Sequence, residues 1–458
     1  MTKTVWIENL GCPKNEVDGE RIESLLSEKG YKITEDQNEA DILILNTCGF
    51  IQSAKEESIE EIFNLIALKN QDRRKKIILC GCFAQRYPNE LWSKLPEVDG
   101  FLGINNIDSV NSLCSTVLKG KRTLKVSSSG RNNGDKKIKR INHRHPYAYI
   151  KIADGCDNRC SYCAIPTIRG RFRSKKIENI LEEAYQLAEQ GVKEINLVAQ
   201  DTTLYGIDLY GKKRLPQILF SLSQISKLKW IRLLYTHPAH FSDELIDQIA
   251  NNPKVCKYVD LPLQHISDDI LKKMRRKVTR KKVEQIIYKL RAKIPSLTLR
   301  TSFIVGFPGE KKKHFDELLD FVEEIKFDNV GVFPYSREEG TKAYDFTGQL
   351  SRKLKQERLD QLMLTQQRIV LERNQTKIGK TITVLIDAKS EEGNGDFVGR
   401  SQAEAPEVDG VVLVKGNNCK IGEFVKVKIV DYSDYDLIGE AINLECQAPP
   451  KAGSSTSA

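Results

Sequence analysis

Three cysteines are grouped in the segment Gly155-Cys156-Asp157-Asn158-Arg159-Cys160-Ser161-Tyr162-Cys163. Their C-x3-C-x2-C spacing brings three thiols together in one short stretch of chain. Three thiolates can ligate three irons of a cubane iron–sulfur cluster and leave the fourth iron open to a substrate or cofactor. Zinc is the competing interpretation, with His143 or His145 as a fourth ligand. These histidines lie upstream among basic residues, so the spacing favours the cluster.

Three further cysteines are far apart in sequence, but each follows an apolar run. The cysteines are Cys12, Cys48 and Cys82, and the runs before them are Thr4–Glu8, Asp41–Asn46 and Lys76–Gly81. We expect these runs to be buried strands of a parallel sheet. The carboxyl ends of parallel strands line one edge of an open sheet, where ligands bind. The sequence therefore predicts a second site with three thiolates, and a glycine beside each cysteine permits tight turns there.

The chain contains eleven cysteines, and clustered cysteines in a reducing compartment bind metal more often than they form disulfides. The remaining five are interpreted as structural or free thiols: Cys80, Cys114, Cys256, Cys419 and Cys446. We expect no secretory signal and no membrane span, because no apolar run approaches the necessary length. The expected location is cytoplasmic, without a membrane partner.

The elements that must position these cysteines predict an α/β protein. Residues 1–118 alternate strands and helices and predict a parallel-sheet α/β domain. Residues 146–350 contain six βα units, which predict a partial TIM-like barrel because the closed form has eight. The six strand candidates are Tyr147–Ile152, Glu194–Gln200, Trp230–Tyr235, Lys257–Pro262, Thr298–Val305 and Asn329–Tyr335. Chemistry on such a scaffold belongs to the loops after the strands.

Four further segments complete the predicted organisation. Residues 351–374 predict a charged connecting helix, and residues 375–446 predict a small all-β domain of OB-like size. The tail 447–458 is expected to be disordered. Residues 119–145 are interpreted as a basic linker, because residues 119–144 carry ten Lys or Arg against one acid. Such a charge run either contacts a polyanion or is simply solvated, and both interpretations stay open.

The chain resembles the radical S-adenosylmethionine (radical SAM) superfamily and, within it, the methylthiotransferases. The matching stretches are Gly11–Asn15, Asn46–Ile51, Gly155–Arg171, Asp260–Ser267, Arg300–Glu310 and Tyr335–Tyr344. The resemblance implies an N-terminal cluster domain, a radical SAM barrel and a C-terminal TRAM domain. It also implies that Cys12, Cys48 and Cys82 hold an auxiliary 4Fe–4S cluster. Cys156, Cys160 and Cys163 would hold the 4Fe–4S cluster that binds S-adenosyl-L-methionine.

The activity implied by this resemblance is insertion of a methylthio group, with two S-adenosylmethionine molecules and a one-electron reductant. The reduced barrel cluster would cleave the cofactor, and the resulting radical would abstract hydrogen from an unactivated carbon. The auxiliary cluster would supply the sulfur. The cofactor provides the reactivity in such enzymes, and the protein provides placement. No catalytic residue beyond the cluster ligands is expected.

Two subtypes of the family fit the cysteine pattern and differ in the acceptor. The RimO type modifies the β-carbon of an aspartate in the twelfth small-subunit ribosomal protein, and the MiaB type modifies isopentenyl-adenosine in transfer RNA. Three stretches favour resemblance to the RimO type: Gly11–Asn15, Asn46–Ile51 and Tyr335–Thr341. A non-catalytic iron–sulfur electron carrier or RNA-binding module is the alternative of another class. Cofactor cleavage by the reduced protein would distinguish it from an enzyme.

The charge of the predicted C-terminal domain favours a basic protein as acceptor. Residues 375–446 carry eight basic and thirteen acidic side chains, hence a net charge of −5 within a chain of +10. An acidic domain is repelled by RNA and attracted to a basic ribosomal protein. The basic segment 119–144 permits contact with ribosomal RNA if the substrate is presented in an assembling ribosome.

Several residues at the predicted barrel rim are candidates for other roles. Gln200 ends the second barrel strand and Gly306 follows the fifth, and both are expected to contact the cofactor. His265 has two open interpretations, a structural histidine or an active-site group. Three arginines beside the barrel cluster either place an anionic substrate or remain solvated: Arg169, Arg171 and Arg173.

Overall fold

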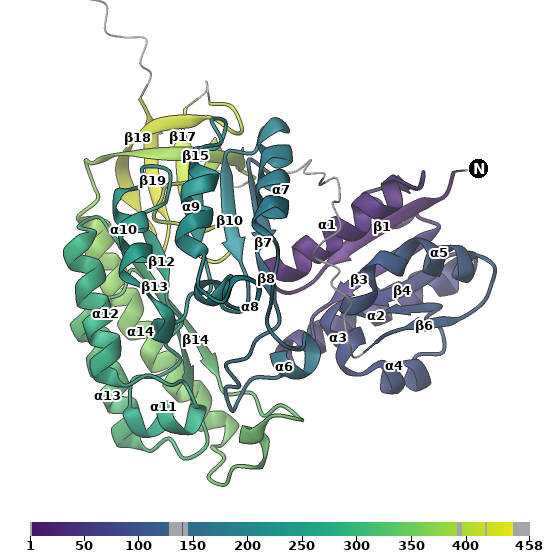
Figure 1. The fold of residues 1–458 in the computed structure, drawn as a ribbon, viewed down its shortest axis with the longest axis horizontal. Coiled ribbons are helices and arrows are strands. Elements are labelled where there is room, and N and C mark those ends of the chain that lie inside the picture. The colour runs from purple at the N-terminus through teal and green to yellow at the C-terminus, as the bar shows by residue number, and fades with distance from the viewer. Residues whose placement is uncertain (1, 128–139, 141–144, 392–395, 417–418, 443–458) are drawn as a thin grey trace, which may run out of the picture. The chain divides into compact units, whose positions relative to one another are not determined.

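A computed structural model describes residues 2–127, 140, 145–391, 396–416 and 419–442. The chain divides into two compact units, Met1–Ile369 and Val370–Ala458. The first unit contains the N-terminal sheet and a barrel of parallel strands, and the second contains a small closed barrel (Figure 1). The predicted tail 447–458 lies outside the described residues, as does the predicted linker from residue 128 to 144, except Arg140.

The N-terminal sheet has six parallel strands in the order β2-β1-β3-β4-β5-β6. The strands are β1 (Thr4–Asn9), β2 (Lys32–Ile33), β3 (Ile42–Thr47), β4 (Lys76–Cys80), β5 (Gly100–Leu102) and β6 (Thr123–Lys125). The helices are α1 (Pro13–Ser27), α2 (Gln52–Gln71), α3 (Gly81–Arg86), α4 (Pro88–Lys94) and α5 (Val110–Leu118). Strand β6 lies within the predicted linker, so the sheet continues beyond residue 118.

The central strand β3 is buried along its whole length because helices cover both faces of the sheet. Successive side chains of a strand point to opposite faces. Ile42 and Ile44 accordingly pack in one core cluster, whereas Leu43 and Leu45 pack in the other. A near-continuous apolar run is therefore what this position in the sheet requires.

The barrel part of the first unit has six parallel strands in two hydrogen-bonded groups, β7-β10-β11 and β12-β13-β14. A parallel bridge between Ile231 and Val255 joins the two groups. The strands are β7 (Tyr147–Lys151), β10 (Glu194–Val198), β11 (Trp230–Leu233), β12 (Tyr258–Asp260), β13 (Thr298–Val305) and β14 (Asn329–Pro334). This arrangement confirms the predicted partial barrel.

Crossover helices cover the outer face of these strands (Figure 1). They are α7 (Ile177–Glu189), α9 (Leu215–Ser223), α10 (Asp243–Asn251), α12 (Arg280–Lys293) and α13 (Lys312–Ile325). One continuous apolar core fills the space between helices and strands. The short strands β8 (Ala153–Asp154) and β9 (Arg173–Ser174) pair antiparallel and enclose the loop of the barrel cysteines.

The N-terminal sheet and the barrel are joined by a buried carboxylate. Glu338, which is 2% exposed and follows β14, accepts hydrogen bonds from Lys55 Nζ at 2.9 Å and Arg86 Nη1 at 2.8 Å. Both cations belong to the N-terminal sheet domain, on α2 and α3. We refer to these three side chains as the Glu338 clamp. Removing one partner of a buried ion pair is costly, because the other charge is left unpaired and away from water.

The second unit is a closed barrel in the order β15-β16-β17-β19-β18, which confirms the predicted OB-like architecture. Its strands are β15 (Thr381–Lys389), β16 (Phe397–Arg400), β17 (Val412–Lys415), β18 (Phe424–Tyr432) and β19 (Leu437–Ala441). Helix α14 (Arg352–Gln375) corresponds to the predicted connecting helix. Near the C-terminal end of the closed barrel, Asp431, Asp434 and Glu440 are exposed, whereas Asp436 accepts a hydrogen bond from Val411 N.

Within the part of the chain that the structure describes, none of the helices combines the length and apolar composition that crossing a bilayer requires.

Candidate functional site

The three N-terminal cysteines follow the carboxyl ends of three adjacent strands. Cys12 precedes α1 after β1, Cys48 directly follows β3, and Cys82 lies in α3 after β4. Cys48 and Cys82 are buried, and Cys12 is half-buried. Gly11 has a φ of +94°, and a Cβ added there would lie 2.7 Å from the Cβ of Cys48. The turn before Cys12 therefore requires glycine, and it brings the first two strand ends together as predicted.

Two cations act on these thiols. Burial raises the pKa of the Cys12 thiol, but Lys14, Arg169 and the backbone N–H groups of Asn15 and Lys14 together leave that pKa lowered. Burial raises the pKa of Cys48 to about 12, and the neighbouring thiol of Cys82 adds to the effect. The pKa of Cys82 is likewise raised by burial, and Arg169 opposes the shift. Burial therefore favours the neutral thiols of Cys48 and Cys82 until a metal replaces their protons.

Arg169 connects the barrel to the N-terminal cysteines. Its guanidinium is 1% exposed, and Nη2 lies 3.3 Å from Cys82 Sγ and 2.7 Å from Asn15 Oδ1. Nη1 donates to Asp18 Oδ2 at 3.0 Å and to Asp154 Oδ1 at 3.2 Å. Arg169 follows the barrel cysteines in sequence and its side chain contacts Cys82, so it ties the segment after the barrel cysteines to the N-terminal group. This is neither a solvated arginine nor one free to bind substrate.

The other two arginines of the predicted trio have different surroundings. The Arg171 side chain is 87% exposed and lies 3.7 Å from an Asp157 carboxylate oxygen. Arg173 is half-buried in β9 and donates to the backbone oxygen of Arg169 at 3.3 Å. Of the three arginines, Arg171 alone fits the interpretation of a solvated side chain.

The three barrel cysteines lie in the loop after β8, each half-buried. Burial raises the pKa of Cys156 to about 11 and also raises the pKa of Cys163. Arg276, which is 6% exposed, places Nη1 3.9 Å from Cys160 Sγ. It also donates to the carbonyl of Pro262 through Nη2. A fixed cation thus faces the barrel thiols as Arg169 faces the N-terminal ones.

A buried network supports the loop of the barrel cysteines from the next strand. Asp201 Oδ2 accepts hydrogen bonds from Asn158 Nδ2 at 2.7 Å and from His240 Nδ1 at 2.9 Å. Asp201 Oδ1 accepts from Thr203 Oγ1 at 2.6 Å. Ligand-type atoms of Asp201, His237 and His240 lie within 4.8 Å of one another. Since these carboxylate oxygens already accept hydrogen bonds, the group is explained as support for Asn158 in the cysteine loop.

The two residues expected to contact the cofactor, Gln200 and Gly306, differ in which hydrogen-bonding atoms remain available for a ligand. Gln200 Nε2 donates to Asp154 Oδ1 at 3.2 Å, while its Oε1 is buried without a partner among the described residues. Gly306 donates its N–H to Glu310 Oε2 at 2.8 Å, so only its carbonyl is left for a ligand. The Gln200 oxygen is the kind of buried acceptor that a bound donor would satisfy.

His265 is fully buried, and its Nδ1 accepts hydrogen bonds from the backbone N–H of Ile266 at 2.9 Å and of Ser267 at 3.0 Å. Burial lowers the pKa of His265 to about 3, so the ring is neutral and carries its proton on Nε2. This geometry favours the structural interpretation over the active-site one. Of the two histidines considered as zinc ligands, His145 stacks on Tyr147 with their ring centroids 4.9 Å apart, and His143 lies outside the described residues.

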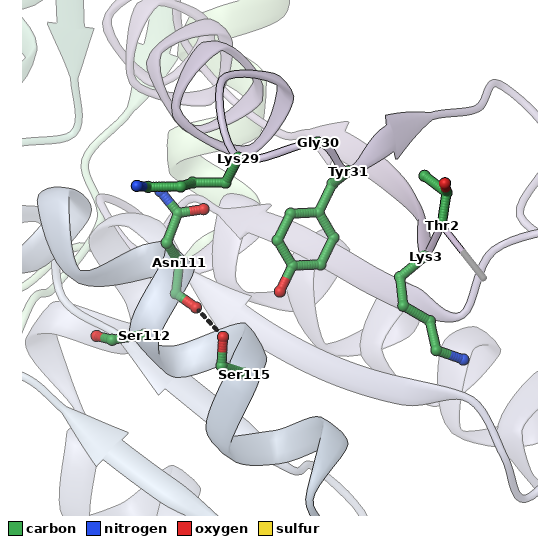
Figure 2. A pocket seen from close by; sticks show the side chains of 8 residues that line it. All are labelled: Thr2, Lys3, Lys29, Gly30, Tyr31, Asn111, Ser112 and Ser115. Atoms are coloured by element: carbon green, nitrogen blue, oxygen red, sulfur yellow. Dashed lines mark hydrogen bonds between the residues drawn. The ribbon is translucent and has the colours of Figure 1, made fainter.

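A hollow of about 470 Å³ on the N-terminal sheet domain is not this site (Figure 2). Its lining comes from Thr2, Lys3, Lys29–Tyr31, Asn111, Ser112 and Ser115. Thr2 and Lys3 precede β1, so the hollow lies toward the amino ends of the strands, opposite the edge where the cysteines lie.

Three family profiles match the chain, in the order of the structural parts. Residues 4–103 match the uncharacterized protein family UPF0004, residues 150–322 match the radical SAM superfamily, and residues 378–442 match the TRAM domain. Two relatives carry the name ribosomal protein uS12 methylthiotransferase RimO. The protein from Desulforamulus reducens is 48% identical over 95% of this chain and 99% of its own. The protein from Caldanaerobacter subterraneus subsp. tengcongensis is 49% identical over 96% of this chain and all of its own.

The chain belongs to the RimO methylthiotransferase family. A solved radical S-adenosylmethionine methyltransferase, TsrM from Kitasatospora setae, covers 75% of this chain and 74% of its own with a TM-score of 0.58. At 14% sequence identity, that likeness concerns the fold alone. The predicted resemblance to the methylthiotransferases is confirmed, together with its three-part architecture.

Sequence reasoning on this RimO-family chain missed several polar residues of the site. Asp201 directly follows Gln200, so the rule that strand ends carry function could have identified it. Lys14 lies in a stretch used to assign the family and the subtype, without a role for its side chain, and Arg276 carried no local signal. Lys14 is 7% exposed, and its Nζ lies 3.1 Å from the centroid of the Tyr235 ring, just beyond β11.

Proposed function

We propose that this chain is a radical SAM methylthiotransferase that inserts a methylthio group at the β-carbon of an aspartate in ribosomal protein uS12. The observation that carries the proposal is the presence of two groups of three cysteines, one of which is contacted by the buried side chain of Arg169 from the segment that follows the other. The names of the full-length relatives support uS12 as the acceptor and the RimO type over the MiaB type. A substrate on the ribosome is consistent with a cytoplasmic location.

The donor atoms of both groups fit 4Fe–4S clusters. Thiolates are the soft ligands that iron–sulfur clusters use, and three thiolates leave one iron open. We propose Cys12, Cys48 and Cys82 for the auxiliary cluster, and Cys156, Cys160 and Cys163 for the cluster that binds S-adenosylmethionine. Cys80 lies close in sequence, but it packs in the apolar core of the N-terminal sheet. When bound, these groups supply reductive cleavage of S-adenosylmethionine, hydrogen abstraction and the transferred sulfur.

The remaining residues of the site bind, orient and exclude water. Arg169 holds Cys82 against the barrel and places a positive charge beside the thiolates, which stabilises their ionised form. Arg276 does the same at Cys160. We propose that the buried Gln200 oxygen and the Gly306 carbonyl accept hydrogen bonds from the cofactor. Burial of Cys48, Cys82 and the Gln200 oxygen limits the access of water to reactive species.

The test is anaerobic reconstitution with iron and sulfide, followed by turnover with uS12 and unmodified transfer RNA side by side. We expect two 4Fe–4S clusters per chain, cleavage of S-adenosylmethionine, and a methylthio mass increment on the target aspartate peptide. Replacing Cys156, Cys160 and Cys163 together with alanine should leave one cluster and no cleavage. Modification of the transfer RNA with none of uS12 would refute the proposed acceptor, and a colourless protein without iron would refute the cluster assignment.

A further inference from the structure

Lys14 is a buried cation for which the described residues provide no carboxylate. It is 7% exposed, and its Nζ contacts the ring of Tyr235, with the Cys12 thiol as the other neighbour that favours its charge. Burying an ammonium group without a counter-ion costs several kcal/mol, so such groups are normally paired. Among the described residues Lys14 has the Cys12 thiol and Tyr235 as partners, but no carboxylate.

Other buried cations of the first unit donate to carboxylates or, as Lys75 and Arg276 do, to backbone carbonyls. Arg232 donates to Glu194 Oε1 at 2.7 Å, and Arg169 donates to Asp18 and Asp154. The carboxylate nearest to Tyr235 does not serve Lys14, because Asp260 is paired with Arg300 Nη1 at 3.1 Å and bonded to Tyr235 N at 2.8 Å. The positive charge of Lys14 therefore remains uncompensated by protein carboxylates among the described residues.

The position of Lys14 is built rather than accidental. Tyr235, beneath the ammonium, has a φ of +58°, a left-handed conformation that is unusual for a bulky residue. Hydrogen bonds fix it on both sides, from its own N–H to Asp260 and from Thr202 N to its carbonyl at 3.1 Å. Backbone held in such a conformation by its surroundings is concentrated at ligand-binding sites. Lys14 follows Cys12 and Tyr235 follows a barrel strand, so the ammonium lies where the two cysteine-bearing parts meet.

We propose that Lys14 binds the side-chain carboxylate of the target aspartate and thereby selects an acidic residue as acceptor. This inference rests on the proposed function. The substrate carboxylate would supply the carboxylate partner that the described residues lack, and the Tyr235 ring would orient the ammonium by a cation–π contact. The β-carbon of aspartate is one bond from the carboxyl carbon, so holding the carboxylate also positions the reacting carbon. A charge-assisted hydrogen bond of this kind is directional enough to do so.

The test compares Lys14→Gln and Lys14→Arg in the full, reconstituted chain. The substrates are uS12 with its natural target aspartate and uS12 with asparagine at that position. The unaltered chain should bind the aspartate form roughly 10- to 100-fold more tightly than the asparagine form, the range for a hydrogen bond to a charged group. Lys14→Gln should reduce this ratio to near one, and Lys14→Arg should retain most of it. The matched control is Lys29→Gln, an exposed lysine just beyond the far end of α1.

Two additional measurements separate recognition from cluster assembly. Lys14→Arg keeps the charge beside Cys12, so it should leave iron content and uncoupled cleavage of S-adenosylmethionine unchanged, and both are measured for Lys14→Gln as well. If this variant loses the auxiliary cluster, or keeps the full preference for aspartate, the carboxylate inference is wrong and Lys14 serves the cluster instead. If the unaltered chain neither binds nor modifies uS12, the proposed function fails as well, so the two failures are distinguishable.

Discussion

Replacing Arg169 with leucine should destabilise the first unit through a defined set of lost contacts. The change removes the hydrogen bonds to Asn15, Cys82, Asp18 and Asp154, at 2.7, 3.3, 3.0 and 3.2 Å. Breaking a buried ion pair costs about 3–5 kcal/mol, because the partner charge is left unpaired. Lys151 still contacts both aspartates, so we expect the lower end, about 3 kcal/mol.

The assay is urea unfolding of the metal-free chain, followed by tryptophan fluorescence. Two of the three tryptophans, Trp6 and Trp92, lie in the N-terminal sheet domain and report its loss. The midpoint should fall in Arg169→Leu with an unchanged slope. Arg169→Lys should be intermediate, because a point charge cannot serve acceptors on several sides as a planar guanidinium does. Arg171→Leu is the exposed control and should change nothing.

The reasoning would be refuted if Arg169→Leu lost less than about 0.5 kcal/mol, the scale of an ordinary surface substitution. It would also fail if Arg171→Leu were equally destabilising. In the reconstituted enzyme, Arg169→Leu should additionally lower the retention of iron at the N-terminal cysteines, because Cys82 loses its fixed neighbour.

Three further outcomes are expected. Cys48→Ala should still cleave S-adenosylmethionine under strong reductant but form no methylthiolated product; loss of cleavage, seen by chromatography of deoxyadenosine, would reverse the two cluster assignments. His265 has its pKa lowered to about 3 by burial, so the unfolded chain alone gains this proton between pH 6.5 and 3, and stability falls as pH drops through that window. His265→Asn should therefore make the pH dependence of unfolding shallower by up to about 1.4 kcal/mol per pH unit, and an unchanged slope in urea titrations would contradict this. Changing Asp431, Asp434 and Glu440 together to lysine should weaken capture of uS12 roughly tenfold at low salt and flatten its salt dependence, because screening removes long-range attraction; capture equal to that of the unaltered chain would exclude the acidic barrel as the docking surface.

The sequence was sufficient to predict where the cysteines lie. Each N-terminal cysteine follows a long apolar run, and parallel strands carry their ends to one edge, so no knowledge of contacts was needed. The barrel strands could also be predicted from the sequence, and the strand Thr298–Val305 has the bounds expected. Periodicity therefore located both cysteine groups on their scaffolds.

Some short strands and the polar support of the site could not be predicted. Strand β19 contains Gly439, where an added Cβ would lie 2.4 Å from Val427 Cγ1, and glycine weakens the strand signal it occupies. Arg169 meets Asn15 across 154 residues of sequence. No local pattern encodes such a contact, because it depends on how the N-terminal sheet and the barrel pack against each other. The sequence therefore identified charged residues within motifs, but it did not predict which residues they contact.

The Glu338 clamp has a consequence for which molecule moves during turnover. Together with the Arg169 contacts, it ties the N-terminal sheet domain to the barrel by buried charges from two directions. Opening that junction would leave several buried charges unpaired at once. The folded state therefore keeps the distance between the two cysteine groups fixed. On the proposed assignment of Cys12, Cys48 and Cys82, the sulfur source is held in place and does not travel to its acceptor. The acceptor peptide has to reach the sulfur, and each round of modification has to end with that peptide withdrawing.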